Sequence, residues 1–388
     1  MKHFEIIVIG GGIQGAGCAQ AAAAAGYSVL LLEQERWGFG TSSRSSKLIH
    51  GGLRYLETFQ FGLVRKSLAE RKILRRIAST LVHPLPFFIP VYKSSRHQGW
   101  KVFAALSLYR LFAGADELAN FRHLPQSEWH TLSGLNREGL KHVFQYWDTQ
   151  TDDRLLTRAV AGSAAGLGAT TREHARFIKA TAENRSCTVT YSEKGAEHQA
   201  TCRVLINAGG PWVAEVQTHI SGAPPPPKID LVKGSHIVLA DKLHDGIFYL
   251  ESPVDRRPMF IMPWQGNTLV GTTEKIFTGD PAAVSASDVE ILYLLKAVAH
   301  YFPDFKCEVL ESFAGLRVLT GWESSFSDRP RDTLIQYDDR GAPRIISLYG
   351  GKLTTYRATA ESIIKKVAPT LGKREHPQDT SEIYLTCG

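Results

Sequence analysis

A G-x-G-x-x-G motif at residues 10–15 constrains the fold of this chain more than any other feature of its sequence. The motif directly follows an apolar run at residues 5–9 that predicts a buried strand, and it opens an alanine-rich stretch at residues 16–25 that predicts a helix. Residues 28–32 (SVLLL) then predict a second buried strand. Such a βαβ unit starts a doubly wound sheet, so the sequence predicts an α/β fold.

The three glycines have the spacing of a dinucleotide site. Gly10 permits a tight turn, Gly12 allows the backbone to approach a pyrophosphate, and Gly15 allows the helix to pack closely on the strand. The N-terminus of the helix offers free N–H groups to the phosphates. Glu33 ends the second strand, where it can accept hydrogen bonds from an adenosine ribose. A glycine turn without a ligand is the less favoured alternative.

Two later glycine turns favour FAD over NAD as the dinucleotide. Residues 207–210 (NAGG) follow an apolar run, and residues 350–355 (GGKLTT) lie between a predicted strand and a predicted helix. An extended FAD needs several close backbone approaches, and a helix start suits the electron-rich end of the flavin. Each turn alone would be an ordinary strand end.

A second polar cluster lies on the glycine-rich loop of residues 42–55. Its hydroxyl, imidazole and cationic side chains suit a ligand that carries a phosphate. The alternative is a solvated polar loop. The cluster consists of Ser42, Ser43, Ser45, Ser46, Lys47, His50, Gly51, Gly52, Arg54 and Tyr55.

The net charge of +7 is concentrated in one block. Residues 54–123 hold twelve Lys and Arg against four Asp and Glu, a local charge of +8 that leaves −1 for the rest of the chain. Such a block favours an anionic partner. Bases alternate with large apolar residues over 62–113, as in helices that bind anionic membrane surfaces, although a solvated helical face is the alternative. No nucleic-acid recognition motif accompanies the charge, so no nucleic-acid partner is expected.

The five cysteines form no C-x-x-C pair, so we expect neither a metal site nor a thioredoxin-type motif. Free thiols fit a reducing compartment. The N-terminal apolar run leads into glycines rather than a cleavage site, and the longest apolar run, residues 19–32, is too short and broken to span a bilayer. A soluble or peripheral protein is therefore expected.

The run TSSRSSKLIHGGLRYLE at 41–57 resembles the signature of FAD-dependent, quinone-linked glycerol-3-phosphate dehydrogenases. The resemblance extends from residue 5 to about residue 370. Further matches follow in order: NAGGPWV at 207–213, KGSHIV at 233–238, MPW at 262–264, GTTE at 271–274, GLRVL at 315–319 and SLYGGKLTTYR at 347–357.

The resemblance implies a glutathione-reductase-like (Rossmann-type) FAD-binding domain interleaved with a β-sheet substrate domain. The FAD-binding domain would comprise residues 1–80, 149–224 and 313–388, and the substrate domain residues 81–148 and 225–312. The proline run at 224–227 would mark one boundary. Family members usually carry a further C-terminal helical domain, which we do not expect in this sequence.

The resemblance also implies roles for individual residues. FAD would contact Gly10, Gly12, Gly15, Glu33, Ser43, Lys47, Ala208, Gly209 and Leu353. The substrate phosphate would be bound by Arg54, Tyr55, Arg317, Arg331 and Lys352, where an arginine fork matches phosphate oxygens. The catalytic residues would be His236, Arg317 and His50.

The implied reaction is oxidation of sn-glycerol 3-phosphate to dihydroxyacetone phosphate. The C2 hydride would go to FAD, and electrons would pass on to a membrane quinone. His236, in preference to His50, would take the hydroxyl proton, and Arg317 would stabilise alkoxide charge. The implied location is cytoplasmic, peripheral on the inner face of the membrane.

Three alternatives remain open at this stage. An oxidase would reduce oxygen to hydrogen peroxide on the same fold. A related flavin oxidoreductase would act on amino or 2-hydroxy acids, but would need a carboxylate clamp rather than a cluster of cations. A flavoprotein used only for binding or sensing would bind the ligand without flavin reduction.

Overall fold

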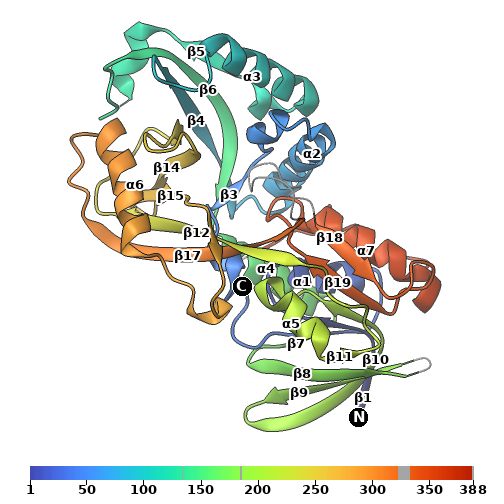
Figure 1. Cartoon of the computed structure of the whole chain (residues 1–388). Helices are drawn as coiled ribbons and strands as arrows, with labels where there is room; N and C mark the ends of the chain where they lie inside the picture. Colours follow the sequence, from blue (N-terminus) through green and yellow to red (C-terminus); the bar gives the residue numbers. More distant parts are fainter. Residues whose placement is uncertain (133, 184–185, 322–332, 387–388) are drawn as a thin grey trace.

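The computed structural model describes residues 1–132, 134–183, 186–321 and 333–386, which form two β-sheets with helices packed against them (Figure 1). The first sheet has the strand order β11-β8-β9-β10-β1-β2-β7, with β19 beside β10 and β18 beside β19. These strands are β1 (Lys2–Ile9), β2 (Val29–Leu32), β7 (Thr170–Arg172), β8 (Ala175–Ala182), β9 (Cys187–Glu193), β10 (Ala196–Asn207), β11 (Ile220–Ser221), β18 (Leu334–Tyr337) and β19 (Ile345–Tyr349).

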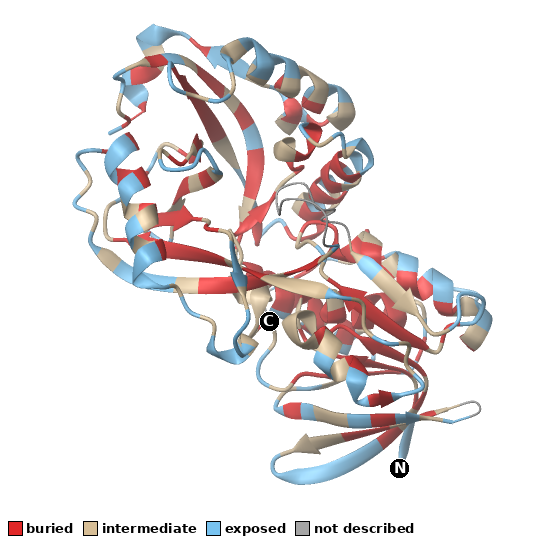
Figure 2. Ribbon diagram, in the orientation of Figure 1, coloured by how far each residue is buried: buried red, intermediate tan, exposed pale blue. Residues whose placement is uncertain are grey.

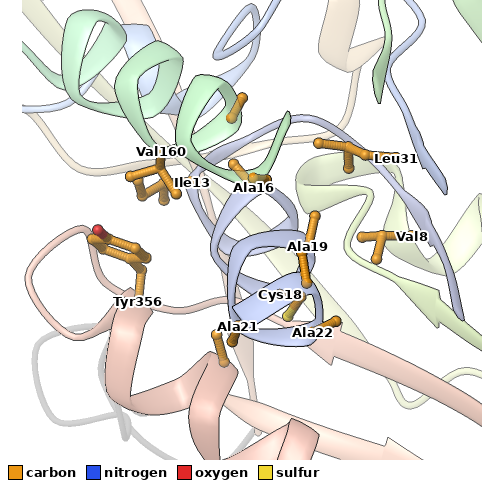
Figure 3. Packing of buried hydrophobic residues seen from close by; sticks show 14 of the residues in the cluster. Val8, Ile13, Ala16, Cys18, Ala19, Ala21, Ala22, Leu31, Val160 and Tyr356 are labelled. Atoms are coloured by element: carbon orange, nitrogen blue, oxygen red, sulfur yellow. The ribbon is translucent and has the colours of Figure 1, made fainter. Parts of the chain in front are cut away.

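Helix α1 (Ile13–Ala24) lies in the core of this half of the molecule and is buried on nearly every side. It contacts the sheet, α4 (Asp153–Gly166) and α7 (Tyr356–Leu371), whereas α5 (Val213–Thr218) packs against β10, β11 and β19. Figure 3 shows its alanines between Val8 and Leu31 of the sheet and Val160 and Tyr356 of the two helices. A helix that is apolar all round must be buried, and alanine side chains allow its neighbours to approach closely. The predicted βαβ unit is confirmed.

The second sheet has the strand order β16-β12-β15-β14-β13-β4-β6-β3, with β17 beside β12 and β5 beside β6. Figure 2 shows that buried residues follow its long central strands. The strands are β3 (Leu48–Ile49), β4 (Val82–Tyr92), β5 (Arg122–Leu124), β6 (Leu140–Thr151), β12 (Ile229–Leu239), β13 (Ile247–Glu251), β14 (Pro258–Trp264), β15 (Asn267–Gly271), β16 (Lys275–Phe277) and β17 (Val309–Thr320).

Helices α2 (Phe61–Ile77), α3 (Gly99–Ala113) and α6 (Asp288–Tyr301) accompany this second sheet. A capping box starts α6, because the backbone N–H of Ser287 donates to Glu290 Oε2 at 3.1 Å. Short 3₁₀ turns complete the described elements: η1 (Thr41–Ser43), η2 (Leu53–Leu56), η3 (Glu117–Ala119), η4 (Gln126–Thr131), η5 (Gly210–Trp212) and η6 (Pro281–Ala283).

Strand β4 contains three prolines, at positions 84, 86 and 90, which are more typical of a loop or an edge strand. It nevertheless lies inside the second sheet, between β6 and β13. The prolines occupy alternate positions, so their missing N–H groups all face one edge of β4. The intervening residues keep their N–H groups for the other neighbour, which allows β4 to pair along β6 over its full length.

The domain boundaries stay a prediction. Two strands show how the sheets relate to those boundaries. Strand β3 belongs to the second sheet although it lies within residues 1–80, and β17 crosses the predicted boundary at residue 313. The polypeptide therefore passes repeatedly between the two sheets, and the loops at these crossings surround the site described next.

Candidate functional site

A cavity of about 320 Å³ is lined by loops at the end of the first sheet and by strands of the second. The strands β1, β10 and β19 are parallel neighbours, so their carboxyl ends lie at the same edge of the sheet. The three glycine turns that follow these strands therefore meet at one side of the cavity. This edge is where doubly wound sheets bind nucleotides.

The first glycine turn is held by close packing and by hydrogen bonds. A Cβ atom on Gly15 would lie 1.8 Å from the Gly10 carbonyl oxygen, so no larger residue fits there. The Gly11 N–H donates to Glu33 Oε2 at 2.6 Å, and the Ile13 N–H donates to Ser42 Oγ at 2.9 Å. Burial raises the pKa of Glu33, which lies at the end of β2 as predicted.

The predicted cofactor residues fall into two groups. Gly12, Ala208 and Leu353 line the cavity. Gly10, Gly15, Glu33, Ser43, Lys47 and Gly209 lie close to these loops without lining the cavity. Their contact with FAD stays a prediction.

Lys47 is engaged by protein groups. Its Nζ donates to Asp153 Oδ1 at 2.6 Å and to the Ser43 carbonyl oxygen at 2.6 Å, and both partners of the Lys47–Asp153 ion pair are buried. Lys47 therefore anchors the start of α4 to the polar loop. Ser43 does not line the cavity, whereas its neighbour Ser42 does, together with Ser45 and Ser46.

The residues of this edge fit an extended dinucleotide. Gly12, Gly350 and Gly351 line the cavity, so the backbone is accessible at two separate turns. The side-chain oxygen of Gln14 is buried in the cavity wall and has no hydrogen-bond partner within the described part of the chain. An accessible glycine backbone beside an unsatisfied polar atom is what a bound pyrophosphate and ribityl chain require.

Cationic side chains from three separate segments line the other part of the cavity. Arg54 comes from η2, Arg317 from β17 and Lys352 from the loop after β19. Lys352 Nζ lies 3.5 Å from the centre of the Tyr55 ring, and Arg317 Nη1 lies 3.4 Å from Glu274 Oε1. Arg54 Nη2 is buried, and no described residue accepts a hydrogen bond from it. The predicted cluster is thus brought together around one space.

The predicted catalytic histidines also line this cavity. His236 is buried, stacks on Phe313 with ring centres 4.9 Å apart, and places Nε2 3.0 Å from Ser46 Oγ. Burial, together with the charges of Arg317 and Lys47, lowers the pKa of His236 to about 3. The backbone N–H of His50 donates to Thr354 Oγ1 at 3.2 Å, which joins the polar loop to the last glycine turn. Arg331 lies outside the described residues.

The sequence reasoning missed the aromatic wall of the cavity. Phe87, Tyr146, Tyr249 and Phe260 line it from strands β4, β6, β13 and β14. These side chains face one another, with Phe87 5.1 Å from Tyr146 and Tyr249 5.3 Å from Phe260 between ring centres. Strands β4 and β6 lie far in sequence from β13 and β14, so sheet pairing brings these rings together.

The comparisons with known proteins agree with this geometry. The family model described as FAD dependent oxidoreductase matches residues 5–357. A glycerol-3-phosphate dehydrogenase from Pseudomonas aeruginosa is 38% identical over 379 residues, which cover 94% of this chain and 72% of that protein. The chain belongs to the FAD-dependent glycerol-3-phosphate dehydrogenase family. The predicted fold class, enzyme class and FAD cofactor are confirmed.

Two further members of this wider group are informative. A D-erythritol 1-phosphate dehydrogenase from Brucella abortus is 35% identical over 377 residues, covering 95% of this chain and 75% of that protein. The structure of a glycerol-3-phosphate dehydrogenase from Bacillus halodurans complexed with FAD matches with a TM-score of 0.78 and 26% identity, covering 99% of this chain and 68% of that one. The relatives of this chain thus include an enzyme that is named for a longer polyol phosphate.

Proposed function

We propose that this enzyme oxidises the secondary hydroxyl of a small polyol phosphate, with sn-glycerol 3-phosphate as the preferred substrate and dihydroxyacetone phosphate as its product. The observation that supports this most strongly is the set Arg54, Arg317 and Lys352 around one cavity that the glycine turns also line. A phosphate dianion needs several cations, and a buried guanidinium nitrogen without an acceptor needs an anionic partner.

The amino-acid and 2-hydroxy-acid alternatives fit this cavity less well. A single carboxylate carries one charge and is matched by one arginine fork, whereas four cationic side chains line this space, those of Arg44, Arg54, Arg317 and Lys352. The aromatic wall formed by Phe87, Tyr146, Tyr249 and Phe260 would cover the substrate carbon chain and limit its length.

Each protein group has a proposed task in the reaction. Arg54 and Lys352 bind the phosphate oxygens, and Arg317 stabilises negative charge on the C2 oxygen as its proton leaves. His236 accepts that proton, because it is held neutral and so keeps a lone pair available. FAD, when bound, supplies the group that accepts the C2 hydride. His50, fixed through its backbone to Thr354, lies at the junction of the two loops.

Anaerobic mixing of the FAD-loaded enzyme with sn-glycerol 3-phosphate tests this proposal directly. We expect the flavin absorbance near its visible maximum to bleach with glycerol phosphate, and to persist with plain glycerol. D-erythritol 1-phosphate in a third cuvette measures how strictly the aromatic wall limits chain length. Equal bleaching by glycerol and by its phosphate would show that phosphate recognition is wrong, and no bleaching by any of the three would favour a binding module.

We also propose that electrons pass to a quinone at a membrane surface, which helix α3 contacts. Among the described residues we find no helix with both the length and the apolar character to cross a bilayer. Only Leu106 and Tyr109 of α3 are buried, whereas Trp100, Phe103 and Leu111 are more than half exposed. Exposed and intermediate residues accordingly cover most of this helix (Figure 2). Lys101 lies over the exposed Trp100 ring, and Arg65 lies over the half-buried Phe112 ring, so basic side chains accompany aromatic rings on this helix. Such a surface suits the headgroup region of an anionic bilayer.

A peroxide measurement separates the quinone proposal from the oxidase alternative. During turnover in air-saturated buffer, a dehydrogenase should transfer most electrons to an added short-chain quinone and release little hydrogen peroxide. Stoichiometric peroxide with no gain from quinone would instead identify an oxidase.

A further inference from the structure

A fully buried ionic network lies directly behind the loop that carries His50, Arg54 and Tyr55. Its centre is Arg71 of α2, which is 0% exposed. Arg71 Nη2 donates to Asp116 Oδ2 at 2.6 Å, and Nη1 donates to Asp148 Oδ1 at 3.0 Å. Arg71 belongs to the basic block of residues 54–123, so part of that block's charge is internal and neutralised rather than available to an external anion.

Tyr109 extends this network to the substrate loop. Its hydroxyl donates to Asp148 Oδ2 at 2.8 Å. The backbone N–H of Gly51 donates to the Tyr109 hydroxyl oxygen at 3.1 Å and to Asp148 Oδ2 at 3.3 Å. Burial and the neighbouring Asp148 raise the pKa of Tyr109 well above its ordinary value, so the hydroxyl stays protonated. The Gly51 amide is therefore fixed by a buried hydroxyl and a buried carboxylate.

The packing around Gly51 leaves no space for a side chain at this position. A Cβ atom on Gly51 would lie 2.3 Å from the Tyr109 hydroxyl oxygen and 2.5 Å from a Leu68 methyl group. Gly51 follows His50 directly, and η2, which carries Arg54 and Tyr55, starts two residues later. A shift of the Gly51 amide would consequently displace the side chains on both sides of it within the cavity.

We propose that Tyr109 and Asp148 are positioning residues, which set the placement of Arg54 and Tyr55 for phosphate binding by holding the Gly51 amide. This inference rests on the proposed function, since it assigns Arg54 to the substrate phosphate. Neither Tyr109 nor Asp148 lines the cavity, so their effect reaches the substrate only through the loop. A misplacement of about 1 Å at a binding group can cost about a hundredfold in rate, so a small loop shift is sufficient.

The test compares the FAD-loaded Tyr109→Phe enzyme with a matched control, Tyr92→Phe. Both changes delete a buried hydroxyl that donates one hydrogen bond, since Tyr92 donates to the Asn136 carbonyl oxygen at 2.7 Å in another part of the second sheet. For Tyr109→Phe we expect KM for sn-glycerol 3-phosphate to rise about tenfold while flavin content stays at the wild-type level. Tyr92→Phe should lose similar thermal stability with no change in KM.

Hydrogen–deuterium exchange of the segment 48–57 supplies a second readout that needs no turnover. The Gly51 amide and its neighbours should exchange faster in Tyr109→Phe than in wild type or Tyr92→Phe. If wild type fails to oxidise glycerol phosphate, the proposed function fails, and the exchange comparison still decides whether Tyr109 holds the loop. Equal exchange in the two variants, with KM changed by less than about twofold, would overturn the positioning role.

Discussion

The hydroxyl oxygen of Ser46 lies 3.0 Å from Nε2 of His236, in the wall of the substrate cavity. The imidazole is buried between this serine and the ring of Phe313, so its orientation is fixed before substrate arrives. Arg317 and Lys47 both disfavour its protonated form. A phosphate dianion bound by Arg54 and Lys352 in the same cavity would reduce that positive field, and His236 would then become a stronger base in the complex than in the free enzyme.

Replacing His236 by Gln should slow flavin reduction by glycerol 3-phosphate by about a hundredfold or more, the usual contribution of a general base. Gln has a similar size and can still face Ser46, so FAD content should not change. Stopped-flow absorbance under anaerobic conditions measures the rate. His142→Gln serves as control, because His142 pairs with His123 on an exposed surface. Reduction at the wild-type rate would remove His236 from the reaction.

His236 should also make the folded enzyme sensitive to acid. Its pKa falls from 6.5 to about 3 in the folded state, so the unfolded chain takes up a proton at a pH where the folded one does not. The resulting stabilisation is complete above pH 6.5 and is lost as the pH falls toward 3. The loss is at most about 1.4 kcal/mol per pH unit. The melting temperature of His236→Gln should therefore fall less than that of wild type between neutral pH and pH values below 6.5. An equal fall of melting temperature with pH in wild type and His236→Gln would contradict the lowered pKa of His236.

Glu33 should be needed for tight FAD binding, since its carboxylate holds the first glycine turn through the Gly11 and Glu35 N–H groups. We expect Glu33→Ala to weaken FAD binding about tenfold to a hundredfold, as for loss of a hydrogen bond to a charged group. Release of flavin fluorescence on dilution measures the affinity. The control is Glu35→Ala, because Glu35 is exposed and contributes only its backbone to this contact. Equal affinities of the two variants would show that the turn does not depend on the carboxylate.

The buried pair of Lys47 and Asp153 should stabilise the fold only as a pair. Lys47→Met leaves a buried carboxylate without its cation, which should cost about 3–5 kcal/mol in the free energy of unfolding. The double variant Lys47→Met with Asp153→Leu should recover most of that loss, because no charge then remains buried. Urea unfolding of wild type, of the two single variants and of the double variant gives the four free energies of unfolding that a double-mutant cycle compares. A double variant as unstable as the sum of its singles would show that the two residues act independently.

Helix α3 should direct the enzyme to anionic vesicles. Replacing Trp100 and Phe103 together by Ala removes two exposed aromatic rings, and should reduce binding to phosphatidylglycerol vesicles about tenfold in a sedimentation assay. The matched control replaces Val289 and Leu292, exposed apolar residues of α6, by Ala. An equal loss in both variants would show that general surface hydrophobicity, rather than α3, decides binding. Higher salt should weaken the wild-type interaction.

Local sequence patterns predicted the parts of the fold that depend on neighbours in the chain. The strand, glycine turn and helix at residues 2–24 could be read directly. The same patterns do not place β4, because its prolines indicate where N–H groups are missing but not which partner strand lies on the other side. Sheet order is a long-range property, which a local pattern does not contain.

The site shows the same division between local and long-range information. His50, Arg54 and Tyr55 were found because they share one loop with a recognisable sequence. The residues that support them were missed. Tyr109 and Asp148 lie 58 and 97 positions from Gly51 in the sequence. Arg71 does not differ in the sequence from the other basic residues around it. A buried ion pair is recognised only when both partners are placed, and the alternating bases of this region suggested a surface instead.

The order in which the chain is made has a consequence for how the cofactor is acquired. The cavity takes Gly12 from one end of the sequence and Thr354 from the other, with Ala208 between them. Strand β19 can join β10 only after residue 349 has left the ribosome, so no shorter nascent chain holds a complete flavin pocket. Yellow colour in the purified protein thus reports that synthesis has passed residue 349, and a fragment ended by a stop codon before that residue would be colourless.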